Sequence, residues 1–158
     1  MAKAYPAKRF VLYSGDNDIG LVGGLRSPEA IAENFRLTVE AIRSQVPDAE
    51  ILVISIKPSL SPIRRARGGA VRETNALIKA QGERLGGVTY IDVYHRMLTE
   101  SGSPDRKYFR WDGIHLSEAG YELWKKAVTE KLPLVRLPQE GGQSDAPELS
   151  EKVSVSAL

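Results

Sequence analysis

The chain has 158 residues, within the usual size of one domain, and 42% of them are hydrophobic, which is enough to build a core. Its formal net charge is only +2, so no nucleic-acid partner is expected, and the absence of cysteine excludes disulfides and thiolate metal sites. No apolar run approaches the length of a membrane span, and residues 1–10 lack the apolar stretch of a signal peptide.

Three apolar runs are predicted to be strands: residues 10–13, 51–56 and 88–93. They are rich in β-branched and aromatic residues and nearly unbroken by polar ones, as strands covered on both faces are. Helical patterns separate them. The chain is therefore predicted to be an α/β domain with a parallel sheet between layers of helices, and its site is expected at the carboxyl ends of the strands.

Helix starts are marked by serines. Ser27 followed by a proline and an acidic residue predicts a helix, as does Ser117 near the end of the chain. A further helix is predicted over residues 70–85, closed by glycines. The last helix is expected to bury an apolar stripe made of Tyr121, Trp124, Val128 and Leu132.

The segments at 16–27 and 59–69 read as loops. From about residue 139 the chain is rich in Gly, Ser and Glu and has no apolar stripe, so residues 139–158 are predicted to be a disordered tail. We therefore expect one domain over residues 1–138.

Asp112 and His115 lie three residues apart, just before the last helix. A carboxylate that accepts the Nδ1 proton of a histidine fixes its tautomer and leaves Nε2 to take a proton, which suits a general base near neutral pH. Taken separately, Asp112 reads equally as a surface carboxylate, and His115 as a residue packed beside Trp111.

A second polar stretch, Ser14-Gly15-Asp16-Asn17-Asp18, follows the first predicted strand directly. Asn and Asp side chains often serve only as turn formers. However, this stretch and the Asp112 stretch both follow strands of one parallel sheet, so we expect them to meet at the same edge.

Together these stretches resemble the SGNH hydrolases, also called GDSL-type lipases and esterases. Residues 14–18 look like the family's Gly-x-Asn-Asp block, and residues 112–117, followed by Gly120, Tyr121 and Trp124, look like its closing Asp-x-x-His block and helix. The strand ending Ile56-Lys57-Pro58-Ser59, then Asn75 and Tyr90-Ile91-Asp92-Val93, are further landmarks in the same order. The resemblance runs from about residue 5 to 132.

The resemblance implies a three-layer, flavodoxin-like α/β/α fold and hydrolysis of a small-molecule ester by a Ser-His-Asp mechanism. By this resemblance His115 is the base, Asp112 orients it, Asn17 donates to the oxyanion and Gly15 supports the turn. No metal or organic cofactor is implied.

The chain departs from the family because it contains no Gly-Asp-Ser block, which carries the family's nucleophilic serine. We expect it to be amino-terminally incomplete, with exposed sheet edges that favour self-association. Ser14 is a minor candidate for the nucleophile, whereas Ser55 is expected to be buried and Ser117 to cap a helix. The alternative is a non-catalytic remnant or binding module with the same fold.

Two further features have ordinary interpretations. The loop at residues 59–69 contains Arg64, Arg65 and Arg67, which are predicted to face solvent. Because this loop follows the second strand at the edge of the sheet where the site is expected, an anionic substrate could contact them. His95 is expected to be solvated in a short turn, without a carboxylate partner.

Overall fold

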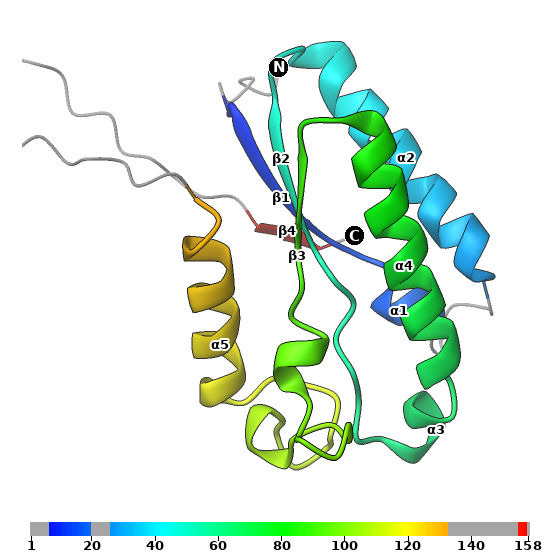
Figure 1. Cartoon of the computed structure of the whole chain (residues 1–158), viewed down its shortest axis with the longest axis vertical. Coiled ribbons are helices and arrows are strands. Elements are labelled where there is room, and N and C mark those ends of the chain that lie inside the picture. The colour runs from blue at the N-terminus through cyan, green and yellow to red at the C-terminus, as the bar shows by residue number, and fades with distance from the viewer. Residues whose placement is uncertain (1–6, 20–25, 133–154, 158) are drawn as a thin grey trace, which may run out of the picture.

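Strands and helices alternate through the whole domain (Figure 1). The computed structural model describes residues 7–19, 26–132 and 155–157. In chain order the elements are β1 (Arg9–Tyr13), α1 (Asp16–Ile19), α2 (Pro28–Gln45), β2 (Glu50–Ile54), α3 (Pro62–Arg65), α4 (Gly68–Leu85), β3 (Val88–Ile91), the 3-10 helices η1 (His95–Met97) and η2 (Arg106–Tyr108), α5 (Glu118–Thr129) and β4 (Val155–Ala157).

The strands form one parallel sheet in the order β3-β2-β1-β4. In the middle of the sheet, Leu52 of β2 pairs with Val11 of β1 on one side and with Thr89 of β3 on the other. Parallel neighbours need a crossover connection, and α2 and α4 supply the two that link β1 to β2 and β2 to β3. The predicted α/β class and parallel sheet are confirmed.

The sheet separates two helical layers. Side chains of a strand point alternately to its two faces, so Ile51 and Val53 pack against α2 and α4, whereas Leu52 and Ile54 pack toward α5. Figure 1 shows α2 and α4 together on one side of the sheet and α5 on the other. Because both faces of β2 are buried, its sequence must be apolar at successive positions, which is the pattern that predicted it.

Serine caps begin two of the helices, as predicted. The hydroxyl of Ser27 accepts a hydrogen bond from the N–H of Ala30 at 3.3 Å, and that of Ser117 accepts one from the N–H of Gly120 at 3.2 Å. Each cap satisfies one of the N–H groups that a helix leaves without a partner in its first turn. The cap at Ser117 also sets where the chain turns after the Asp112 stretch.

The prediction of plain loops at 16–27 and 59–69 was wrong in part. Each segment holds a one-turn helix, α1 and α3 respectively, while residues 20–25 lie outside the described part. One turn is too short to repeat an apolar position, so hydrophobic periodicity cannot reveal it.

The buried face of α5 also differs from the prediction. Tyr121 is 59% exposed, because α5 packs through Gly120, Leu123, Trp124 and Ala127. A Cβ at Gly120 would lie 2.4 Å from a main-chain oxygen of η2, so the helix approaches closely where it carries no side chain. Glycine and alanine form part of this face, so the spacing of large apolar residues does not indicate it fully.

Within the segment predicted to be a tail, β4 is a short edge strand that pairs with β1 through Val155 and Val11. Residues 139–154 and 158 of that segment lie outside the described residues, so the disordered tail and the domain boundary at 138 stay predictions.

Candidate active site

The Gly15 stretch turns sharply at the end of β1 to begin α1. Gly15 has a φ of +94°, a conformation that side-chain-bearing residues rarely adopt. A Cβ at this position would lie 2.8 Å from Cγ2 of Ile31 and 2.9 Å from Cδ1 of Ile56. The turn that presents Asp16 and Asn17 therefore requires glycine for both its backbone conformation and its packing.

Asp112 holds the imidazole of His115 within one tight turn. Its Oδ1 accepts the N–H groups of Ile114 and His115 at 2.8 and 2.9 Å, and its Oδ2 lies 2.6 Å from Nδ1 of His115. The hydrogen bond from the imidazole, followed by those two N–H groups, lowers the pKa of Asp112 well below its usual range.

Asp112 therefore stays ionised and fixes the tautomer of His115 that carries its proton on Nδ1. Among the described side chains, only Asp112 is hydrogen-bonded to this imidazole, which is 72% exposed. Its Nε2 is consequently available for proton transfer, the arrangement of a general base with an orienting carboxylate.

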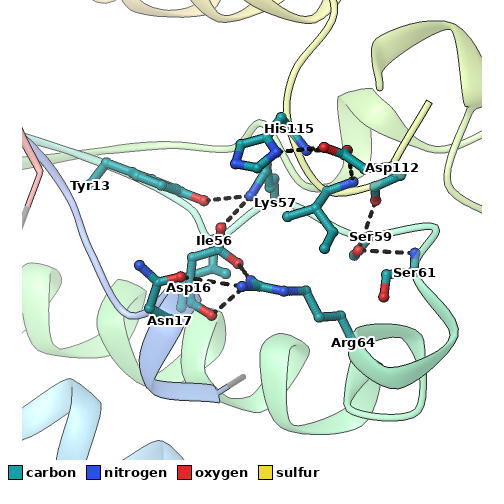
Figure 2. Close-up of polar contacts among 12 residues, drawn as sticks. Tyr13, Asp16, Asn17, Ile56, Lys57, Ser59, Ser61, Arg64, Asp112 and His115 are labelled. Atoms are coloured by element: carbon teal, nitrogen blue, oxygen red, sulfur yellow. Dashed lines mark hydrogen bonds and ion pairs between the residues drawn. The ribbon is translucent and has the colours of Figure 1, made fainter. Parts of the chain in front are cut away.

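The Asp112 turn is tied to the segment that follows β2. The carbonyl oxygen of Gly113 accepts hydrogen bonds from the N–H of Leu60 and the hydroxyl of Ser59, both at 2.9 Å. Gly113 has a φ of +69°, and a Cβ there would lie 2.8 Å from Cβ of Leu60. Asp16 of the other motif stretch contacts Lys57 of this same segment, so both stretches lie at the sheet edge where β2 ends, as expected (Figure 2).

Asp16 is the centre of a charged network beneath the site. Its carboxylate forms ion pairs with Nζ of Lys57 and, at 2.7 Å, with a guanidinium nitrogen of Arg64. The side chains of Lys57, Arg64 and Asp16 are only 8%, 17% and 22% exposed. Lys57 also donates to the hydroxyl of Tyr13 at 3.3 Å. Burial, and then the negative charge of Asp16, raise the pKa of Tyr13 well above its usual value.

Sequence reasoning missed Lys57 and misplaced Arg64. Lys57 directly follows the almost wholly apolar run at residues 51–56, and a lysine in that position is a signal for a buried counter-ion. Arg64 was predicted to face solvent with Arg65 and Arg67, but it is largely buried against Asp16. The one-turn helix α3, which the sequence pattern does not reveal, directs its side chain inward.

Arg64 also orients Asn17, because one of its N–H groups donates to Oδ1 of Asn17 at 3.2 Å. This contact identifies the carbonyl end of the amide and leaves Nδ2 as its donor. In the described part of the chain, Nδ2 has no hydrogen-bond acceptor. Figure 2 shows His115 and Asn17 on opposite sides of the contact between Lys57 and Asp16.

The hydroxyls of three serines near this edge have structural partners. Ser55 is buried, as predicted, and accepts the N–H groups of Val93 and Tyr94 at 3.0 and 2.9 Å. Ser59 bonds to the Asp112 turn, and Ser117 caps α5. No hydrogen bond joins a serine to the imidazole of His115 within residues 7–19, 26–132 and 155–157.

His95 does have a carboxylate partner, contrary to the prediction. Asp92, at the end of β3, accepts the N–H of His95 at 3.0 Å and lies 2.7 Å from its Nδ1. The imidazole is 71% exposed, so its predicted solvation is confirmed. The same local turn therefore occurs twice, since Asp92 and His95 have the three-residue spacing of Asp112 and His115.

The described residues contain neither a cluster of metal-binding side chains nor a membrane-spanning helix. No three side chains of the His, Cys, Asp or Glu type converge there in a way that would hold a metal ion. No described helix combines the length and apolar character that crossing a bilayer requires.

Comparison with known proteins matches residues 1–123 to the GDSL-like lipase/acylhydrolase family. No curated protein matches the chain. Among solved structures, it is similar to a GDSL-like lipase from Bacteroides thetaiotaomicron (20% identity, TM-score 0.64), a lipase/acylhydrolase from Enterococcus faecalis (22%, 0.59) and a family 3 carbohydrate esterase from Clostridium thermocellum (22%, 0.55).

Each of these similarities covers 78% of this chain, which spans 60%, 60% and 56% of the three structures respectively. At such low identities the likeness establishes the fold. The family match extends over most of the sequence and includes both the Gly15 and the Asp112 stretches. The chain therefore belongs to the GDSL-like lipase/acylhydrolase family.

Proposed function

We propose that this chain forms the acid–base and oxyanion part of a serine ester hydrolase. His115 is the general base, Asp112 orients it, Asn17 donates to the oxyanion, and Gly15 supports the turn that presents Asn17. The observation that carries the proposal is the 2.6 Å contact between Asp112 and Nδ1 of His115, which leaves Nε2 open at the same edge as Asn17.

In the proposed reaction, a serine oxygen attacks the ester carbonyl carbon while Nε2 of His115 takes the serine proton. The carbon–oxygen bond to the alcohol then breaks, and His115 returns the proton to the departing oxygen. Water attacks the acyl-enzyme in the same way and releases the acid. Through Nδ2, Asn17 stabilises the negative oxygen of each tetrahedral intermediate, a contribution of about 3–4 kcal/mol for one such donor.

No serine of this chain is assigned as the nucleophile. The sequence contains no Gly-Asp-Ser block, and the hydroxyls of Ser55, Ser59 and Ser117 have the structural partners described above. Among the described residues, Ser14, the minor candidate, forms no hydrogen bond with the imidazole of His115. We infer that the attacking serine comes from a polypeptide segment outside these 158 residues. The same observations favour the alternative, a binding module that has kept the fold and the base but performs no chemistry.

Sequencing the DNA upstream of the Met1 codon, and expressing the extended reading frame, tests the proposal. We expect an in-frame Gly-Asp-Ser about 60–80 codons upstream, the length of the absent β-α-β-α units. The extended protein should hydrolyse p-nitrophenyl acetate and react at that serine with a fluorophosphonate probe.

The His115→Ala variant should lower kcat/KM by about 10³-fold or more. His95→Ala is the matched control, because the same turn and the same exposure recur there, and it should stay within about twofold of wild type. A stop codon directly upstream, with neither labelling nor hydrolysis by the folded chain, would establish the binding module instead.

A further inference from the structure

A pocket of about 190 Å³ lies beside Asp16, between the start of α4 and the loop at residues 102–104. It shares Asp16, Lys57 and Ser59 with the site described above, so it opens at the same edge of the sheet. A molecule held by Asn17 and His115 would have this pocket as its neighbour.

The lining of the pocket is strongly cationic. Lys57 and four arginines (Arg64, Arg65, Arg67 and Arg72) line it, against the single carboxylate of Asp16. Asp16 is already engaged by Lys57 and Arg64. The other three arginines form no ion pair with any described residue, so their charges remain for a ligand.

Arg72 and Arg67 are placed at the beginning of α4, where the pocket also reaches Gly68. A Cβ at Gly68 would lie 3.6 Å from a terminal nitrogen of Arg72, so the guanidinium folds back over the first residue of the helix. A guanidinium presents paired N–H donors that match the oxygens of a carboxylate or a phosphate.

The size of the pocket limits what fits. Pockets for drug-sized ligands usually measure about 300–1,000 Å³, so about 190 Å³ accommodates a small group and not a whole lipid. Ile19, Val71 and Tyr94 provide an apolar wall on which a short carbon segment can pack. The pocket is thus suited to a compact anion at the end of a small organic molecule.

We propose that this pocket binds an anionic group, a carboxylate or a phosphate, carried by the ester substrate, and that Arg67 and Arg72 are its specificity-determining residues. The assignment of the bound anion to an ester substrate rests on the proposed hydrolase function. The binding itself needs no turnover and is measured separately.

Calorimetric titration of the purified chain with inorganic phosphate and with succinate, at constant ionic strength, tests the proposal. We expect a dissociation constant below about 10 mM for at least one of them, and the more tightly bound anion identifies the class of group. Arg67→Gln and Arg72→Gln should each weaken binding at least tenfold, because each removes a charge-assisted contact.

Arg84→Gln is the control matched to Arg72→Gln, since Arg84, like Arg72, is exposed on α4 and has no ion pair among the described residues, but lies away from the pocket. It should change the affinity less than twofold. His115→Ala should also bind phosphate normally, which separates this test from that of the hydrolase. Absence of binding by wild type, or an equal loss in Arg84→Gln, would overturn the proposal.

Discussion

Removal of the Asp16 carboxylate tests whether the network beneath the site is a cooperative unit. Asp16→Ala leaves the ammonium of Lys57, whose side chain is 8% exposed, with the hydroxyl of Tyr13 as its only hydrogen-bond partner among the described residues. Removing one partner of a buried ion pair costs about 3–5 kcal/mol, because the remaining charge is still withdrawn from water. We expect the free energy of unfolding to fall by about that amount.

The second variant removes the other charge. In Lys57→Met the new side chain has a similar length and no charge, and Asp16 keeps Arg64 as a partner. This substitution should therefore lower the free energy of unfolding by about 1–2 kcal/mol or less. In the double variant no ammonium remains to be stranded. The cost of the double variant should therefore fall short of the sum of the two single variants by about 2–3 kcal/mol, the upper part of the range of about 0.5–3 kcal/mol for residues in contact.

Urea unfolding followed by tryptophan fluorescence measures these values, with equal m-values as the check that the same transition is compared. Asp18→Ala is the control. Among the described residues, the side chain of Asp18 forms just one ion pair, a more exposed one with Arg26 at 3.3 Å, so its removal should cost less than about 1 kcal/mol. The reasoning fails if Asp16→Ala costs no more than this control, or if the two single effects add within about 0.5 kcal/mol.

Three other predictions concern the supports of the site. The side-chain amide of Asn75 forms hydrogen bonds with both main-chain polar groups of Ile56, at 2.8 and 2.9 Å. Asn75→Leu removes both bonds and should lower the free energy of unfolding in urea by about 2–6 kcal/mol, whereas a loss below about 1 kcal/mol would contradict the buried geometry. Gly113 and Gly102 both have positive φ, but only at Gly113 would an added Cβ meet a neighbour, at 2.8 Å. Gly113→Ala should therefore be more destabilising than Gly102→Ala by about 1–3 kcal/mol, and equal losses of stability in thermal melts would refute this prediction. The raised pKa of Tyr13 contributes stability that is complete below about pH 10 and declines as the pH rises further. Wild type should therefore lose its stability advantage over Tyr13→Phe in urea unfolding between about pH 9 and 11, whereas a constant difference in stability would argue against this reasoning.

The two Asp-x-x-His turns illustrate what a local pattern can predict. Asp112 and His115 were expected to pair, and they do, because a three-residue spacing lets one carboxylate bond both the N–H and the imidazole of the same residue. Asp92 and His95 have the same spacing and the same contacts, but were not expected to pair. The three-residue spacing alone was therefore sufficient to predict this second pair.

The charged network is a different case. Lys57 and Arg64 are 41 and 48 residues from Asp16, and nothing in their immediate neighbours indicates which carboxylate they meet. The pocket depends on the same long-range packing, since it draws on the end of β2, on α3 and α4, and on the loop at residues 102–104.

The sequence by itself therefore determined β1, β2 and β3, the long helices, the serine caps of α2 and α5, and the Asp112–His115 pair. Each of these depends on backbone geometry and burial within one turn or one strand, which residue order and apolar spacing encode directly. Only the tertiary structure decided that Asp16 is held by Lys57 and Arg64, that α5 packs through Gly120 and exposes Tyr121, and that arginines gather at one pocket. Those contacts join distant segments, and their geometry exists only after the sheet has brought the strand ends together.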